Sequence, residues 1–291
     1  MYEKFYGFKE RPFNMTPDSR FFFKSEKHEE ALSHLLVAIS QRNGFAVITG
    51  EVGSGKTTVT RTLLRRLDEE TKVALILNTH LSQKELLTSI LEDFGVQYKN
   101  TSKTALLSAL NAFLLEQAED EKNVVIIIDE AQNLKPSVLE EVRMLSNLET
   151  EEEKLLQIIL IGQPELRKKL RDPKLRQFTQ RIVFYYHLEP LNHDETVKYI
   201  NHRIKTAGCA KESLFTPMAL ELIHKYSSGI PRMINLLCHN ALINGLVADT
   251  SIINAGQVES AAKQLMHNIY LTSSQQAEEK IIDFENTIVN S

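Results

Sequence analysis

One motif of eight residues constrains this chain more than any other feature. Residues 50–57 have the sequence Gly-Glu-Val-Gly-Ser-Gly-Lys-Thr, which matches the pattern G-x-x-x-x-G-K-[ST] at every fixed position. An apolar run over 44–50 precedes the loop and a helical pattern over 55–68 follows it, which is the strand–loop–helix frame of a phosphate-binding loop. The alternative is a glycine-rich turn that matches by chance, and the frame argues against it.

The glycines of this motif allow the backbone to curl so that successive N–H groups face phosphate oxygens. The start of the following helix adds a partial positive charge. We expect Lys56 to reach the β- and γ-phosphates of ATP, and the hydroxyl of Thr57 to bind Mg²⁺. The residues predicted to bind the nucleotide here are Gly50, Glu51, Val52, Gly53, Ser54, Gly55, Lys56, Thr57 and Thr58.

Two carboxylates follow the longest aliphatic run of the chain. Residues 124–128 are all Val or Ile, and Asp129 and Glu130 come directly after them. Side chains at the carboxyl ends of parallel strands converge on the ligand crevice. Asp129 is therefore predicted to hold Mg²⁺, and Glu130 to position or activate the attacking water. Two exposed acids in a loop are the alternative.

Short apolar runs alternate with helical patterns up to Pro190. This alternation is typical of a parallel sheet covered by helices on both faces. We therefore predict an α/β fold with a five-stranded parallel sheet over 1–190, whose residues 1–25 form an irregular N-terminal arm. The strands are expected at 44–50, 73–77, 124–128, 155–161 and 182–187, and the helices at 26–42, 55–68, 83–94, 103–118, 136–148 and 164–170.

The strand signal stops after Pro190. A small all-helical lid domain is predicted over 191–268, followed by a tail over 269–291. A helix at 275–288 in this tail would have one apolar side, which we expect to dock on another subunit or a partner. The helices of the lid are expected at 193–206, 216–226, 231–246 and 255–266.

Composition excludes several classes of protein. Lys and Arg number 34 against 38 Asp and Glu, and this net charge of −4 excludes a uniformly basic nucleic-acid coat. Cys209 and Cys238 belong to no C-x-x-C motif, so neither a disulfide framework nor a zinc site is expected. The N-terminus lacks the apolar core of a signal peptide, and the run 124–128 is far too short to cross a bilayer. We expect a cytoplasmic protein that reaches the inner membrane only through a partner.

A Gly-Ile-Pro-Arg motif opens one of the lid helices. Pro231 suits the first helical position, which places Arg232 in the first turn. A cation there opposes the dipole of its own helix. A γ-phosphate beside Arg232 would compensate this cost, whereas an ordinary surface arginine is the alternative.

The phosphate-binding loop, the Asp-Glu strand end and the Gly-x-Pro-Arg motif together resemble the AAA+ ATPases. Further segments make the chain similar to the ExeA/GspA group, which includes secretion-pathway ATPases, and most of all to its short members of the MshM type from MSHA-pilus biogenesis. Longer ExeA-like proteins carry a membrane span and a peptidoglycan-binding module after the ATPase, which we do not find here. The resemblance covers about 1–265, and its segments are 14–18, 162–166, 175–182 and 229–237.

This resemblance implies roles for five further residues. Gln163 would be the sensor 1 residue and Arg232 the sensor 2 arginine. Arg181 falls where AAA+ proteins place the arginine finger that completes a neighbour's site, and Asn78 where many keep a polar partner for the catalytic Glu. Phe13 would line the adenine site, unless it only packs the N-terminal arm.

The implied function is that of a Mg²⁺-dependent AAA+ ATPase, a ring-like homo-oligomer that couples ATP hydrolysis to assembly or function of a bacterial secretion system or pilus. The first alternative is a DNA-associated ATPase, such as a transposition target-selection regulator. It rests on the basic segment 166–181, which has seven Lys and Arg against one Asp and which otherwise is a solvated helix. The second alternative is a nucleotide switch without turnover, against which the intact Glu130 argues. His28-Glu29 begins like a zinc-protease motif, but Leu32 takes the place of the second His, so a metalloprotease is rejected.

Overall fold

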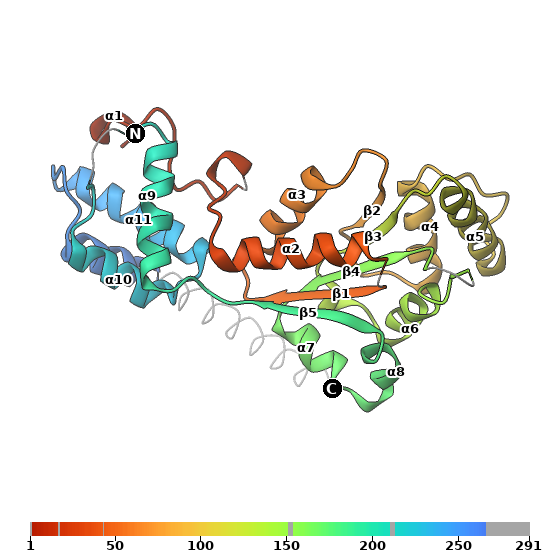
Figure 1. The fold of residues 1–291 in the computed structure, drawn as a ribbon. Helices are drawn as coiled ribbons and strands as arrows, with labels where there is room; N and C mark the ends of the chain where they lie inside the picture. The colour runs from red at the N-terminus through yellow and green to blue at the C-terminus, as the bar shows by residue number, and fades with distance from the viewer. Residues whose placement is uncertain (1, 17, 43, 151–153, 210–212, 266–291) are drawn as a thin grey trace, which may run out of the picture. The chain divides into compact units, whose positions relative to one another are not determined.

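The computed structural model describes residues 2–16, 18–42, 44–150, 154–209 and 213–265, which divide into two compact units (Figure 1). The first, termed the core unit, comprises the described residues of 18–190. The second, termed the helical unit, combines 2–16 with the described residues from Leu191 onward.

A single five-stranded sheet forms the centre of the core unit. Its strands run parallel in the order β2-β3-β4-β1-β5. This confirms the predicted α/β class, because all five strands appear within a few residues of the apolar runs that predict them. Their bounds are β1 Phe45–Gly50, β2 Lys72–Ile76, β3 Val124–Ile128, β4 Gln157–Gly162 and β5 Ile182–Leu188.

Helices cover both faces of this sheet, which explains why its central strands are apolar throughout. In β3, Val125 and Ile127 face one hydrophobic cluster while Val124, Ile126 and Ile128 face the other. The first cluster is completed by α2 (Glu26–Ser40) and α3 (Lys56–Arg66). The second is completed by α4 (Gln83–Asp93), α5 (Lys103–Glu119), α6 (Pro136–Leu145), α7 (Pro164–Leu170) and α8 (Arg176–Thr179).

Polar side chains fix where several of these helices begin. The Ser25 hydroxyl accepts a hydrogen bond from the backbone N–H of His28 at the start of α2. Ser82 and Glu85 form a reciprocal capping box at the start of α4. Because such caps satisfy otherwise unpaired N–H groups, they define the first turn more sharply than apolar periodicity does. Short 3₁₀ turns lie at Ser19–Phe21 (η1), Ala131–Asn133 (η2) and Pro173–Leu175 (η3).

The helical unit contains the helices predicted beyond Pro190. Residues 255–265 are also helical. The predicted tail at 269–291, with its helix at 275–288, lies outside the described residues. No helix in the described part of the chain is long and apolar enough to cross a membrane. The remaining helices are α9 (His193–Thr206), α10 (Pro217–Ser227) and α11 (Pro231–Val247).

The N-terminal arm does not belong where the sequence reading puts it. Residues 2–16 group with the helical unit rather than with the predicted domain 1–190, and their irregular path includes a short helix, α1 (Glu3–Tyr6). The buried Tyr6 donates its hydroxyl to the carbonyl oxygens of Leu242 (3.3 Å) and Thr250 (3.0 Å). These buried bonds tie the arm to the end of α11, a long-range pairing that no local pattern encodes.

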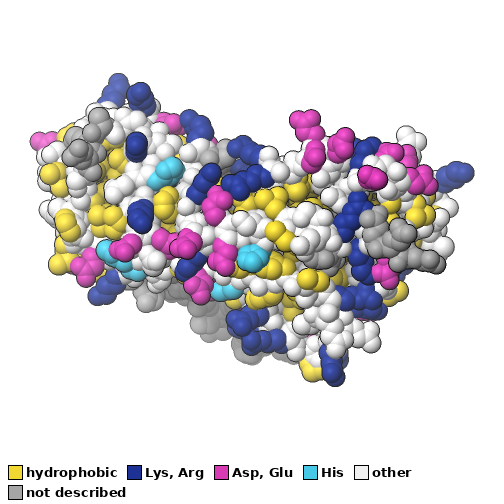
Figure 2. Space-filling model, in the orientation of Figure 1, with side chains coloured by type: hydrophobic (Ala, Val, Ile, Leu, Met, Phe, Trp, Pro, Cys, Tyr) yellow, Lys and Arg dark blue, Asp and Glu magenta, His cyan; other side chains and the backbone are white. Residues whose placement is uncertain are grey.

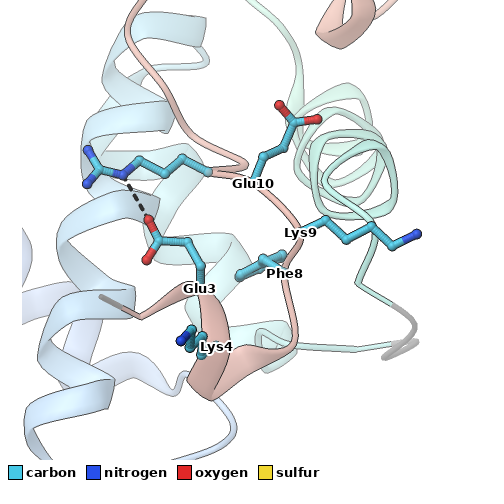
Figure 3. A pocket seen from close by; sticks show the side chains of 6 residues that line it. Glu3, Lys4, Phe8, Lys9 and Glu10 are labelled. Atoms are coloured by element: carbon cyan, nitrogen blue, oxygen red, sulfur yellow. Dashed lines mark hydrogen bonds and ion pairs between the residues drawn. The ribbon is translucent and has the colours of Figure 1, made fainter.

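A buried arginine makes the second anchor of the arm. Arg203 of α9 donates from Nε to the carbonyl oxygen of Pro12 at 2.6 Å, and from Nη1 to the hydroxyl of Tyr199 at 2.9 Å. Nearer the surface, Arg11 Nε donates to Glu3 Oε1 at 2.8 Å beside a shallow hollow lined by Phe8 (Figure 3). The arm therefore contributes its aromatic side chains to the helical unit.

Candidate active site

The loop between β1 and α3 has the curled backbone that its sequence motif predicts. Gly53 and Gly55 lie in the left-handed region, with φ of 83° and 104°. A Cβ on Gly50 would lie 2.7 Å from Ser54 Oγ and 2.9 Å from the carbonyl oxygen of Leu188, so only glycine fits. Ser54 Oγ is buried and, among the described residues, has no hydrogen-bond partner. The loop is therefore tightly packed at Gly50, and the Ser54 hydroxyl has no described hydrogen-bond partner within it.

Lys56 lies across this loop with its side chain nearly buried. Its Nζ donates to the carbonyl oxygens of Gly50 (2.8 Å) and Glu51 (2.9 Å). Burial lowers the pKa of Lys56, and the charges of Glu130 and Asp129 oppose that shift. The next residue, Thr57, is exposed and Thr58 is half-buried, while Glu51 and Val52 are exposed at the loop tip.

Asp129 and Glu130 directly follow β3. The Asp129 carboxyl is buried and accepts the Glu130 backbone N–H at 2.8 Å. Burial and the neighbouring Glu130 charge raise the pKa of Asp129, against the lowering effect of this hydrogen bond and of Lys56. Glu130 has a positive φ of 51°, which is costly for a residue with a Cβ. The backbone therefore turns sharply at Glu130 and directs the carboxylate away from the strand.

Two glutamine amides hold the Glu130 carboxylate. Gln163 Nε2 donates to Glu130 Oε2 at 3.0 Å, and Gln132 Nε2 donates to the same oxygen at 2.5 Å. The glutamines also hold each other, because Gln132 Oε1 accepts the Gln163 backbone N–H at 3.0 Å. Burial raises the pKa of Glu130, but the bonds from Gln132 and Gln163 outweigh it and the pKa is lowered. Glu130 is therefore ionised and oriented at neutral pH.

Sequence reasoning misses three residues that support this carboxylate. Gln132 lies one residue beyond the Asp-Glu-Ala run, and its position in the motif gives no sign of its role. Lys169 of α7 donates from Nζ to the carbonyl oxygens of Gln132 and Leu134, which fixes η2 below Glu130. The Thr79 hydroxyl donates to the Glu130 carbonyl oxygen at 3.2 Å. The bonds of Lys169 and Thr79 join distant segments, so sequence spacing could not reveal them.

Several of the predicted catalytic and binding groups of the core unit converge on one edge of its sheet. Three neighbouring strands, β3, β4 and β1, deliver Asp129 and Glu130, Gln163, and the loop that contains Lys56. Because all strands are parallel, these groups lie at the same carboxyl edge. The arrangement provides N–H donors and a cation for phosphates, oxygen donors of the type Mg²⁺ prefers in Thr57 and Asp129, and an ionised base. The residues fit MgATP.

Asn78, the predicted polar partner of the catalytic Glu, makes a different bond in the structure. Asn78 follows β2 as an exposed residue, and its Oδ1 accepts the His80 backbone N–H at 3.2 Å. The glutamines, rather than Asn78, are the described partners of the Glu130 carboxylate. Arg232 is exposed in the first turn of α11 in the helical unit, as its motif predicts.

The structure buries Phe13, the residue predicted to line the adenine site, within the helical unit. Only 1% of Phe13 is exposed, and its ring meets that of Phe215 edge to face at 6.3 Å within the helical unit. A ring enclosed in this way has almost no surface left for a ligand. The packing alternative explains it, because an arm with so many aromatic residues needs an apolar pocket to bury them.

Arg181 lies at the other end of the sheet. Its neighbour Ile182 pairs with Phe45 at the start of β1, whereas the phosphate-binding loop begins at Gly50 at the end of that strand. Arg181 is half-buried and donates from Nη1 to the hydroxyl of Ser146 at 2.8 Å. Five residues of strand separate the two ends, roughly 17 Å, which is more than an arginine side chain spans.

The sequence of this chain is similar to those of known proteins. Residues 39–170 match the family described as an AAA domain. General secretion pathway protein A of Aeromonas hydrophila is 45% identical over 266 residues, which are 91% of this chain and 48% of the relative. The chain therefore spans about half the length of that curated relative.

Solved structures share the fold at low identity. Cdc6p from Pyrobaculum aerophilum aligns with a TM-score of 0.64 and 19% identity, over 86% of this chain and 71% of that chain. The RuvB Holliday junction branch migration motor of Thermotoga maritima aligns with a TM-score of 0.56 and 19% identity, over 84% of this chain and 70% of that chain. Drosophila ORC bound to DNA aligns with a TM-score of 0.66 and 18% identity, over 91% of this chain and 66% of that chain. These structures show that the chain has their P-loop AAA fold, and residues 39–170 match the AAA domain family within it.

Proposed function

We propose that this protein hydrolyses MgATP and couples the hydrolysis to the assembly or function of a bacterial secretion system or pilus. One observation carries the proposal: a phosphate-binding loop, an acidic strand end and a glutamine clamp meet at the carboxyl edge of three neighbouring strands. An AAA domain with these groups has everything that turnover requires within its own core unit, apart from a transition-state cation.

The loop would bind the triphosphate through its N–H groups and through Lys56. The loop already encloses the Lys56 ammonium, which donates to two of its carbonyl oxygens. Phosphate oxygens are stronger acceptors than carbonyls, so Lys56 would exchange these partners for the nucleotide. Thr57 and Asp129 would hold the magnesium, which when bound neutralises charge on the phosphates.

Glu130 would accept the proton of the attacking water. In the described part of the chain both hydrogen bonds to its carboxylate end on Oε2, which leaves Oε1 to face a water molecule. The clamp fixes the direction of that oxygen, and the lowered pKa keeps the carboxylate ionised. Gln163 would in addition sense the γ-phosphate, because its amide already lies beside the base.

Two arginines would complete the site on assembly. Arg181 cannot reach the loop of its own chain along the sheet, so we assign it to the site of a neighbouring subunit in a ring-like homo-oligomer. Arg232, exposed at the start of α11, would contribute a second cation from the helical unit. Asn78 would contact the nucleotide-bound water or the base only after a local rearrangement.

The cellular role rests on the relative. The name of the Aeromonas protein refers to the general secretion pathway, and we extend that role to this chain. We further propose that the protein is of the short MshM type from pilus biogenesis, that its partners are secretion or pilus assembly proteins, and that it works in the cytoplasm, held at the inner membrane by them.

A matched pair of strains tests this role. Cells that lack the gene should regain secretion or piliation with the wild-type chain and should fail to do so with Glu130→Gln expressed at the same level. Loss of ATP turnover after Mg²⁺ is removed by chelation, and its return on adding Mg²⁺, tests the metal requirement. Full rescue by Glu130→Gln would separate the cellular role from hydrolysis and would favour a nucleotide switch.

A DNA-associated ATPase remains the second candidate because of the basic segment 166–181. Lys and Arg side chains gather over α7 in Figure 2. Lys169 is committed to η2, and Phe178 is fully buried, so the segment offers no stacking platform for bases. Salt-sensitive DNA binding that ATP stimulates would favour this candidate. The exposed cations are Arg167, Lys168, Arg171, Lys174 and Arg176.

A further inference from the structure

We infer that His28 is a positioning residue of the nucleotide site, which orients one peptide group of the phosphate-binding loop from behind. The inference rests on the proposed nucleotide binding at this loop. His28 belongs to a sequence fragment that resembles a zinc-protease motif and lacks its second histidine. The structure places the same imidazole, only 5% exposed, against the loop between β1 and α3.

A hydrogen bond joins the imidazole to the loop. His28 Nε2 lies 3.2 Å from the carbonyl oxygen of Ser54. Because a carbonyl oxygen only accepts, Nε2 must carry the proton. In the neutral tautomer with the proton on Nε2, Nδ1 is an acceptor, and Ser25 Oγ lies 2.5 Å from it. Ser25 therefore donates its hydroxyl proton to Nδ1 while it accepts the His28 backbone N–H, and both of its functions match this tautomer.

The fit between ring and loop depends on glycine. A Cβ on Gly55 would lie only 2.6 Å from His28 Nε2, so any other residue would push the loop and the imidazole apart. Glycine is thus required at position 55 twice, for the positive φ of the turn and for this approach. On its other side the ring meets Phe22 edge to face at 5.9 Å. The imidazole therefore contacts the Ser54 carbonyl, the Ser25 hydroxyl and the Phe22 ring.

Peptide geometry gives this contact a consequence for the ligand. The C=O and N–H of one trans peptide group point in opposite directions. The Ser54 carbonyl points at His28, so the N–H of Gly55 in the same peptide group points away from the imidazole. In a phosphate-binding loop such N–H groups are the ligands of the phosphate oxygens. His28 holds the peptide group in the orientation that presents this N–H to the nucleotide and keeps the carbonyl oxygen away from it.

A set of substitutions tests whether the N–H donor at Nε2 or the imidazole ring as a whole is what the loop requires. Gln can place an amide N–H near the position of Nε2, whereas the shorter Asn reaches only as far as Nδ1. Wild-type chain, His28→Leu, His28→Gln and His28→Asn would be compared by calorimetric titration with MgATP, MgADP and AMP. His34→Leu is the matched control, because His34 is exposed on the same helix and stacks on Phe184 at 4.4 Å.

We expect His28→Leu and His28→Asn to weaken MgATP and MgADP by about tenfold, the value of one orienting hydrogen bond. His28→Gln and His34→Leu should stay within about threefold of the wild type. AMP, which lacks the β- and γ-phosphates, should be affected less by the substitutions than MgATP and MgADP. Equal MgATP affinity in His28→Leu and the wild type, or equal losses in the Gln and Asn variants, would overturn the inference.

The thermal unfolding midpoint of each variant without nucleotide guards against a purely structural effect. If His28→Leu fails to fold, the comparison of Gln with Asn decides alone, because both keep a polar side chain in place. Lys56→Ala is measured in parallel. Unchanged nucleotide affinity in Lys56→Ala would refute the proposed function itself, whereas a loss in Lys56→Ala with no loss in His28→Leu would refute only the role of His28.

Discussion

The two ends of the central sheet differ in the hydrogen bonds that their polar and charged side chains make within one chain. At the carboxyl edge, Lys56, Glu130 and Gln163 engage each other or neighbouring loops through bonds of 2.8–3.0 Å. At the amino edge, Arg181 has Ser146 as a neutral partner, although an arginine has five N–H donors. The contrast indicates a preorganised half-site at the carboxyl edge and an arginine at the amino edge that bonds to a neutral hydroxyl and lowers the pKa of Glu140. An assembly that brings the amino edge of one chain to the carboxyl edge of the next would combine the two.

The largest expected effect is that of Arg181→Ala. Arginine fingers contribute roughly 10³–10⁵ in rate, so loss of Arg181 should remove most turnover and also its rise with protein concentration. The affinity for ATP should change by less than a few fold, since the loop is intact. Steady-state ATPase assays over a wide range of protein concentration measure both quantities.

Mixing experiments sharpen the same comparison. Arg181→Ala carries an intact carboxyl edge, and Glu130→Gln an intact amino edge, so mixed assemblies should regain part of the activity. Arg176→Ala is the matched control from the same basic segment, where the side chain is exposed. If Arg176→Ala is inactive and Arg181→Ala is fully active, Arg176 is the arginine finger in place of Arg181. Full activity of both variants would contradict the trans arrangement.

Next in size is the effect of Glu130→Gln alone. Its amide cannot accept a proton, so turnover should fall by roughly 10²–10⁴, while nucleotide affinity stays close to that of the wild type. Rapid-quench measurement of a single turnover separates chemistry from product release. Normal single-turnover rates in this variant would remove Glu130 from the mechanism and leave the carboxyl edge without a base.

Lys56→Ala should act on binding rather than chemistry. It removes a charge-assisted donor from an enclosed site, so the affinity for MgATP should fall by at least about a hundredfold. Titration calorimetry gives the dissociation constant. Arg61→Ala, on the same helix α3, is a control for general loss of positive charge near the loop.

The sequence predicts the carboxyl edge far better than its supports. Lys56 and Glu130 sit at fixed positions in short motifs, and a motif with a fixed spacing carries its own geometry. The strands are equally clear, because burial on both faces makes β3 apolar at every position. Local patterns of this kind need no knowledge of the tertiary structure.

What the sequence cannot give are contacts between segments that are distant along the chain. Phe13 belongs to the helical unit because Phe215 provides an apolar surface there, and this pairing leaves no periodic signal. The bond from His28 to the loop joins residues 26 positions apart. The bond from the Gln163 backbone N–H to Gln132 Oε1 also joins distant residues, 31 positions apart, whereas the bond from Gln132 to Glu130 is local and depends on the turn at Glu130.

The smallest effect expected concerns Gln132. Gln132→Ala should lower kcat by about tenfold, the value of one hydrogen bond to a charged group, because Gln163 still holds Glu130 Oε2. Hydrogen bonds to the ionised form lower the pKa of Glu130, so removing one raises it. The base then loses its charge at a higher pH, and the acid limb of the kcat profile should shift upward. Gln177→Ala, exposed on α8, should shift neither kcat nor the profile. A fall in kcat with an unmoved acid limb would mean that Gln132 supports only the backbone of η2, and the glutamine clamp would then reduce to Gln163 alone.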